Sequence, residues 1–149
     1  MNIRAIELTD DNAYLSILER TSEEDRYCRF FHVINHFTKE NISKFINIES
    51  PNVGLIAEQD GIPLGVAHAF ITPEGAEIAL IVAQDARKQG VAYSLMSELS
   101  QRLQDLKMVA FSMLSNRGFA TLATKFGMKS LGIEDGIITW ESIKNPSVN

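Results

Sequence analysis

Residues 86–95 read ARKQGVAYSL, and they connect an apolar run, IALIVA at 78–83, to a segment with helical periodicity. The continuous apolar run is typical of a strand that is buried on both faces of a sheet. Apolar residues then recur at helical spacing from Val91 to Leu106. The junction therefore predicts a tight turn that leads from a central strand into a long helix.

The first turn of that helix is a candidate anion site. Its N–H groups have no acceptor within the helix, and the helix dipole adds partial positive charge. Arg87 and Lys88 add cations, while Gly90 and Ala92 keep the turn free of bulky side chains. A phosphate group can bind to such a turn. The stretch lacks the G-K-[ST] of a Walker loop and the three glycines of a dinucleotide fingerprint, and a plain turn with solvated cations explains the same residues.

Composition favours one globular domain that spans residues 1–149. A chain of this length buries roughly 68–70% of its extended-chain surface without a metal or a disulfide. The net charge of −5 argues against binding to nucleic acid or to an anionic membrane. No apolar run approaches the ~20 residues of a membrane span. The N-terminus lacks a secretory pattern and Cys28 is the single cysteine, so we expect a cytoplasmic protein.

Periodicity and turn residues predict an α/β mixed sheet. The spacers DGIP and TPEG separate three strand-like runs, which indicates an antiparallel meander. The expected strands cover residues 2–8, 52–59, 62–72, 75–83, 107–114, 128–132 and 137–143. The expected helices cover residues 13–20, 22–31, 38–48, 91–106 and 117–126.

Three stretches resemble a known family. RKQGVA at 87–92 is similar to the R/Q-x-x-G-x-G/A signature of the GNAT acetyltransferases, and SNRGFATLATKFGMKSLG at 115–132 resembles the second half of their coenzyme site. SEEDRYCRFF at 22–31 resembles the start of the catalytic domain in bacterial protein-lysine acetyltransferases of the Pat type. The resemblance implies a mixed, mostly antiparallel central sheet of six to seven strands flanked by helices.

The resemblance also implies that the chain is an acetyl-CoA-dependent N-acetyltransferase, with acetyl-CoA as cosubstrate. The fourth and fifth strands would splay apart, so that the pantetheine arm pairs with backbone groups near Ile81 to Ala83. An amide near Val82 would polarise the thioester carbonyl. Asn116 would contact the coenzyme from the other side. The residues expected to hold the coenzyme are Ile81, Val82, Ala83, Arg87, Lys88, Gln89, Gly90, Val91, Ala92 and Asn116.

Glu77 is the candidate general base. It is the first charged residue on the predicted fourth strand, it matches the position of the Pat-type base, and the apolar run after it predicts apolar surroundings. A strand carboxylate without a catalytic role is the other interpretation. Many GNAT enzymes place a tyrosine seven residues after the asparagine as general acid. That position is Ala123, which leaves Tyr93 or Ser115 as possible replacements.

The implied acceptor is an amine, and a protein lysine side chain is the first interpretation because of the Pat-type resemblance. A small-molecule amine is the second. A third interpretation is a module that senses acyl-CoA without turnover, which the alanine at position 123 allows. Neither a monomer nor a homodimer is favoured by the sequence.

A metal site at Cys28, His32 and His36 is disfavoured. Their spacing of four would align them on one helix face. However, the same segment is rich in aromatic residues, and the predicted helix ends near position 31. We therefore expect no metal.

Overall fold

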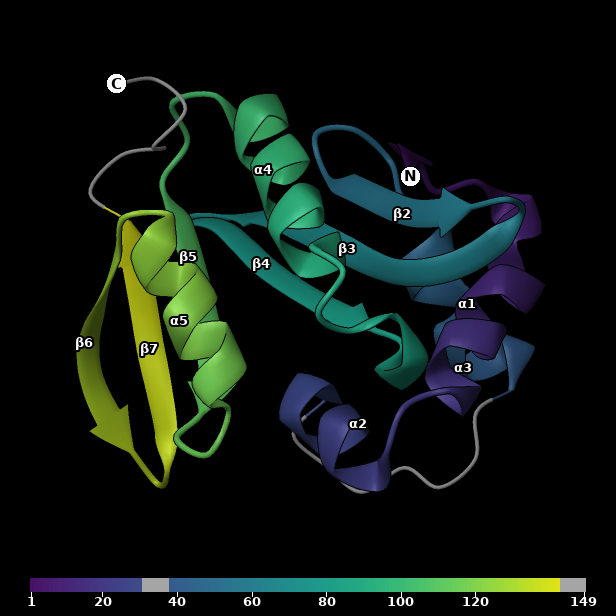
Figure 1. The fold of residues 1–149 in the computed structure, drawn as a ribbon. Coiled ribbons are helices and arrows are strands. Elements are labelled where there is room, and N and C mark those ends of the chain that lie inside the picture. The colour runs from purple at the N-terminus through teal and green to yellow at the C-terminus, as the bar shows by residue number, and fades with distance from the viewer. Residues whose placement is uncertain (31–37, 143–149) are drawn as a thin grey trace.

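The computed structural model describes residues 1–30 and 38–142, and within this part a seven-stranded sheet forms the centre of the fold (Figure 1). The strand order is β1-β2-β3-β4-β5-β7-β6. Only β4 and β5 are parallel among the neighbouring strands of this sheet. The strands are β1 Asn2–Ala5, β2 Val53–Gln59, β3 Ile62–Thr72, β4 Gly75–Val82, β5 Met108–Met113, β6 Met128–Glu134 and β7 Ile137–Ser142.

Helices flank the sheet, which confirms the predicted fold class. In Figure 1, α4 crosses in front of β3, and α5 lies in front of β5 and β7. The α-helices are α1 Asp11–Glu19, α2 Glu23–Phe30, α3 Lys39–Ile46, α4 Val91–Leu103 and α5 Arg117–Lys125. Two short 3₁₀ turns are η1 Leu8–Asp10 and η2 Gln84–Ala86.

The predicted meander is formed by β2, β3 and β4, which pair antiparallel in sequence order. An Asp-Gly dipeptide turns the chain between β2 and β3 and again between β6 and β7. Asp135 and Gly136 both have positive φ, as do Asp60 and Gly61. Two-residue hairpin turns of the primed type require this geometry, because it matches the twist of the strands.

Two predicted boundaries were wrong. The first strand ends at Ala5 instead of residue 8, because Leu8 is 66% exposed and begins η1, where the Asp10 carboxylate accepts the Glu7 N–H. The helix predicted at 91–106 ends at Leu103. Gln104 adopts a positive φ, and Leu106 lies outside the core with 42% of its surface exposed.

The two faces of the sheet bury different helices. The ring of His68 on β3 contacts Tyr14 of α1 and Phe45 of α3, and its Nε2 lies 2.8 Å from the Phe45 carbonyl. A Cβ placed at Gly65 would instead meet Leu95 of α4 at 3.3 Å. Strand side chains alternate between faces, so β3 packs against α1 and α3 with one face and against α4 with the other.

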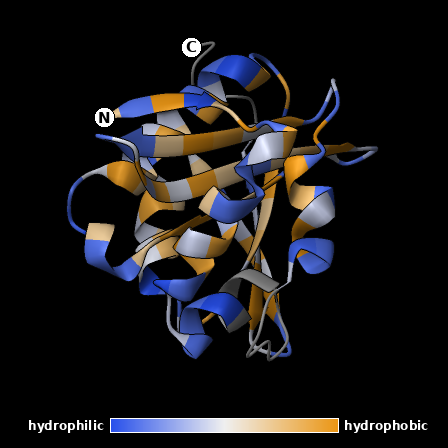
Figure 2. Cartoon of the chain, turned by 90° about the vertical axis from the view of Figure 1, so that its right-hand side faces the viewer, coloured by the Kyte–Doolittle hydropathy of each residue, from blue (hydrophilic) through white to orange (hydrophobic). Residues whose placement is uncertain are grey.

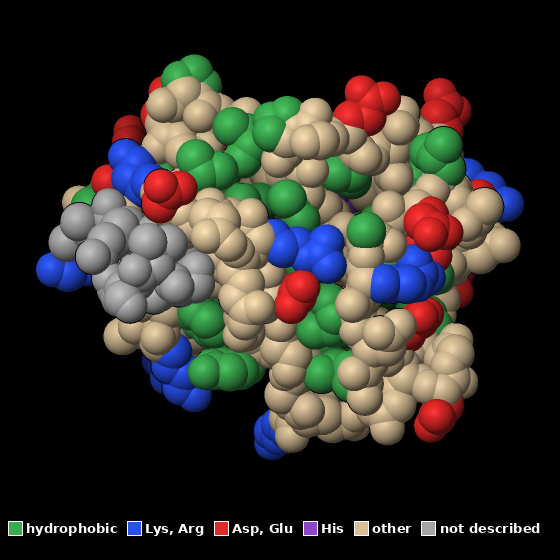
Figure 3. All heavy atoms as spheres, turned by 90° about the horizontal axis from the view of Figure 1, so that it is seen from above, with side chains coloured by type: hydrophobic (Ala, Val, Ile, Leu, Met, Phe, Trp, Pro, Cys, Tyr) green, Lys and Arg blue, Asp and Glu red, His purple; other side chains and the backbone are tan. Residues whose placement is uncertain are grey.

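Apolar residues gather on the strands, while helix turns at the periphery are largely hydrophilic (Figure 2). On the face shown in Figure 3, cationic side chains lie beside acidic ones. Ion pairs join neighbouring elements of the fold, such as Lys107 with Glu141 at 3.2 Å.

Candidate active site

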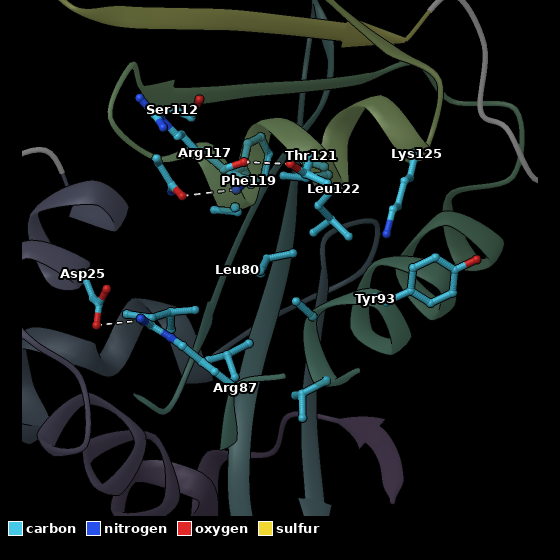
Figure 4. Close-up of a pocket in the computed structure, with 18 of the residues that line it drawn as sticks. Asp25, Leu80, Arg87, Tyr93, Ser112, Arg117, Phe119, Thr121, Leu122 and Lys125 are labelled. Carbon is cyan, nitrogen blue, oxygen red and sulfur yellow. Dashed lines mark hydrogen bonds and ion pairs between the residues drawn. The ribbon is translucent and has the colours of Figure 1, made fainter. Parts of the chain in front are cut away.

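A cleft of about 720 Å³ opens where β4 and β5 part. The two strands pair only at Ala76 with Met108 and at Glu77 with Val109. Beyond these pairs, residues 78–82 of β4 form one wall, and Phe111 and Ser112 of β5 belong to the opposite one. Helices α2, α4 and α5, together with the segments that lead into α4 and α5, supply the remaining lining residues. Figure 4 shows the cleft, whose volume lies within the range of small-molecule and cofactor sites.

Glu77 lies at the vertex of this opening and faces α1 and α3. It pairs with Phe70, whose ring stacks on His68 at 5.8 Å, and paired residues of antiparallel strands share a face. Its side chain is exposed, which differs from the apolar surroundings that the sequence predicts. Within the described residues, the Glu77 carboxylate has no hydrogen bond or ion pair, so it is available to accept a proton.

The open edge of β4 presents backbone groups. Ala76 N–H donates to the Lys107 carbonyl on the β5 side, whereas Ala83 N–H donates to the Leu64 carbonyl on the β3 side. Because N–H groups alternate along a strand, the amides of Leu80 and Val82 point toward the β5 side, where no strand pairs with them. A polar chain in the cleft could pair with these groups as an added strand does.

The N-terminus of α4 also borders the cleft. Gly90 is its N-cap with φ +79°, and a Cβ there would meet nothing within 4 Å. The chain therefore leaves space in front of the first-turn N–H groups of Val91 and Ala92. An anion in that space would meet unpaired donors and the positive end of the helix.

Arg87 is held beside this turn by Asp25 of α2. The Nη2 to Oδ2 distance is 2.7 Å, and Figure 4 shows the pair across the cleft from α5. Asp25 is itself fixed, because Ser22 N–H donates to its carboxylate and Asp25 N–H donates to Ser22 Oγ. Burial alone would raise the pKa of Asp25. The hydrogen bonds from Arg87 and Ser22 outweigh burial and hold this pKa below its usual value.

Asn116 caps α5 from the opposite wall. Its Oδ1 accepts the Phe119 N–H at 3.1 Å, so only its Nδ2 amide remains to donate into the cleft. Ala123 is fully buried and does not line the cleft. Tyr93 and Ser115 do line it. The Tyr93 ring lies against Phe126, at the end of the cleft that also holds Lys125 (Figure 4).

The structure brings most of the sequence-predicted residues together. Two do not line the cleft: Ala83 is buried, and the exposed Gln89 has its amide 3.4 Å from the Asp85 carbonyl. The predicted residues that line it are Glu77, Ile81, Val82, Arg87, Lys88, Gly90, Val91, Ala92 and Asn116.

Sequence reasoning missed one wall of the cleft. Arg117, Thr121 and Lys125 line it from α5. Their spacing of four places them on one helix face, and this signal could have identified them. Phe111 and Ser112 carried no such signal, because their lining position depends on where β5 leaves β4. The same holds for Glu24 and Asp25, which reach the cleft through the placement of α2.

Residues 14–128 match the sequence profile of the Acetyltransferase (GNAT) family. The chain belongs to this family. Membership makes the protein an acetyl-CoA-dependent N-acetyltransferase, as the motifs at 87–92 and 115–132 predicted. No curated protein matches the chain in a sequence search.

Solved structures show the same acetyltransferase fold. The GNAT domain of Pat from S. lividans is 22% identical with a TM-score of 0.83, over 93% of this chain and 88% of that one. The ribosomal-protein-S18-alanine N-acetyltransferase of Escherichia coli is 17% identical with a TM-score of 0.71, over 97% and 93%. PaiA N-acetyltransferase of Thermoplasma acidophilum, solved in complex with coenzyme A, is 14% identical with a TM-score of 0.72, over 95% and 97%.

Metal ligation and membrane insertion find no support in the described part of this acetyltransferase. There, no group of three His, Cys, Asp or Glu side chains could hold a metal ion. His32 and His36 lie outside the described residues. No helix in residues 1–30 and 38–142 has the length and apolar character needed to cross a membrane.

Proposed function

We propose that this acetyltransferase transfers the acetyl group of acetyl-CoA directly to a protein lysine side chain, with Glu77 as general base. The observation that carries the proposal is the place of Glu77. Glu77, whose carboxylate has no hydrogen bond or ion pair with any residue that the structure describes, lies at the last position where β4 pairs with β5. From there it can reach an amine that enters the opening from the α1 and α3 face of the sheet.

A base is required because the free acceptor is protonated. A lysine amine in water has a pKa of about 10.4, so deprotonation near pH 7.4 costs about 4 kcal/mol. Glu77 would take this proton, directly or through one water. The amine nitrogen would then attack the thioester carbon, the C–S bond would break, and the thiolate would take a proton from water. The coenzyme supplies the activated acetyl group, and no covalent bond to the protein is needed.

The cleft carries both cations and carboxylates, and one pair of them, Arg87 and Asp25, is in contact. Arg87 and Lys88 lie beside the α4 turn, and Arg117 and Lys125 lie on α5, where phosphates of the coenzyme would bind. The acidic lining residues are Glu77 on β4 and Glu24 and Asp25 on α2. An alkylammonium acceptor is attracted by carboxylates, and Phe111, 40% exposed, offers an apolar surface for its methylene chain.

The base is tested with Glu77→Gln, which keeps the size of the side chain and removes its proton affinity. We expect kcat to fall about 10²–10⁴-fold while the Kd for acetyl-CoA, measured by calorimetry, stays within about twofold. Glu74→Gln is the matched control, because Glu74 is exposed and lies outside the cleft. A loss of less than about threefold in Glu77→Gln would remove this residue from the mechanism.

The acceptor is tested by incubating the protein and acetyl-CoA with a peptide library and, separately, with small polyamines. Mass spectrometry that finds acetyl groups on lysine Nζ atoms would support the proposal. Acetylation of only the polyamines, or only of peptide α-amino groups, would contradict the lysine assignment while leaving the base in place. Coenzyme binding without transfer to any amine would favour a sensing module instead.

A further inference from the structure

Tyr93 and Lys125 lie together at the outer end of the cleft. Tyr93 lies in the first turn of α4 and is 54% exposed, and Lys125 ends α5. Both line the cleft, and Figure 4 shows them at the same end, away from Asp25. This end lies beyond the α4 turn and away from β4 and β5, which part at Glu77.

The Tyr93 ring is supported from one side. Its centroid lies 5.2 Å from that of Phe126, at an angle of 45°. Phe126 is buried, and its N–H donates to the carbonyls of Leu122 and Ala123 at the end of α5. A ring that is half exposed yet held from behind presents a fixed flat surface, which suits another flat ring.

Lys125 is a cation without an ion-pair partner among residues 1–30 and 38–142. Within the same residues, Lys88 and Arg117, which also line the cleft, have no ion pair either. In contrast, Arg87 is bound to Asp25. A position in the last turn of α5 complements the helix dipole, but it does not account for the adjacent aromatic ring.

Coenzyme A carries phosphate at two separate places. The diphosphate suits the amide turn at Gly90, and a monoester phosphate sits on the ribose beside the adenine base. An exposed aromatic ring can stack on a base, and an adjacent lysine can pair with a phosphate. We propose that Tyr93 stacks on the adenine and that Lys125 binds the ribose 3′-phosphate. This inference rests on the coenzyme position of the proposed function, with the diphosphate at the α4 turn.

The test compares coenzyme A with 3′-dephospho-coenzyme A by calorimetry. We expect the wild type to bind coenzyme A about two- to fivefold more tightly, as one exposed ion pair would give. Lys125→Gln should lose this preference because it binds coenzyme A more weakly and 3′-dephospho-coenzyme A equally well. Lys129→Gln, a substitution of an exposed lysine outside the cleft, should keep the preference.

Tyr93 is tested in the same assay with Tyr93→Leu, which keeps apolar contact with Phe126 but removes the flat ring. Both coenzymes should bind this variant more weakly by the same factor, about fivefold or more, while 4′-phosphopantetheine, which has no adenine, should be unaffected. Thermal melts of both variants check that the fold is intact.

Two results would overturn the inference. One is a Lys125→Gln variant that keeps the full preference, and the other is equal weakening of both coenzymes in that variant. Because binding is measured without turnover, failure of Glu77 as base would leave these results unchanged. Loss of the preference in Lys125→Gln together with full activity in Glu77→Gln would support the subsite and refute the base.

Discussion

Substitutions of Gly90 test where the coenzyme binds. The backbone of this residue has an unusual conformation, but the space in front of it is open. The residue has φ +79°, and a Cβ at this position would meet no atom within 4 Å. A side chain here therefore costs roughly 1–2 kcal/mol in backbone strain, while its Cβ meets no neighbouring atom. Gly90→Gln and Gly90→Glu share this cost, so their difference reports charge alone.

The magnitude follows from the place of the added carboxylate. It would lie at the N-terminus of α4, where the first-turn N–H groups would attract it in place of a phosphate. A single negative charge about 6 Å from a doubly charged diphosphate gives a repulsion of about 1.4 kcal/mol in bulk water and about 5.5 kcal/mol at an effective dielectric constant near 20. We therefore expect Gly90→Glu to bind acetyl-CoA at least about tenfold more weakly than Gly90→Gln.

Calorimetric titration of the wild type and both variants measures this difference, and thermal melts verify that the two variants are equally stable. Equal affinity of Gly90→Gln and Gly90→Glu for acetyl-CoA would refute the reasoning, because it would place the diphosphate away from the α4 turn. Higher salt should narrow the gap between the variants, since part of the repulsion acts through solvent.

Two further predictions concern stability. The pKa of Asp25 is lowered on folding, so the ion pair with Arg87 should stabilise the protein fully above pH ~3.9, the pKa of the unfolded chain, and be lost as the pH falls toward the lower folded pKa. Asp25→Asn should thus unfold about 1 kcal/mol more easily in urea at pH 7, and this difference should shrink steadily as the pH falls below ~3.9; a difference that does not shrink would contradict this assignment. Ala123→Tyr, which restores the family's tyrosine at a fully buried position, should lower Tm by about 3–10 °C through overpacking, and a Tm equal to that of the wild type would show that space exists there.

Local signals were sufficient to predict most of the sheet. The apolar runs of β2 and β3 and the Asp-Gly turn between them are patterns within a few residues of sequence, and the structure forms the strands and the turn there. The end of α4 was harder to predict. Leu106 continues the helical spacing that begins at Val91, yet the helix ends at Leu103 because Gln104 turns with positive φ.

The site was predictable where a motif fixes the backbone and unpredictable where distant elements meet. The turn at Gly90 follows from residues that are adjacent in sequence. The Asp25–Arg87 pair depends on the placement of α2, and nothing local in either segment indicates it. The exposure of the Glu77 side chain could not be predicted from the sequence either. The apolar run that follows Glu77 gives no information about where β5 separates from β4.

One part of β4 pairs with β5 and the other part does not. In the proposed function, this division would let acetyl-CoA and a cationic amine acceptor meet in one cleft. Strand alternation sends the Glu77 side chain toward α1 and α3 while the amides of Leu80 and Val82 point into the opening. A thioester held along those amides would therefore be exposed to an amine from the face that carries Glu77. The coenzyme's phosphates would stay at the α4 and α5 end, among cations. Closing the opening with β5 paired along all of β4 would remove both the amide donors and the passage between the two faces, so the proposed transfer would depend on the early divergence of these strands.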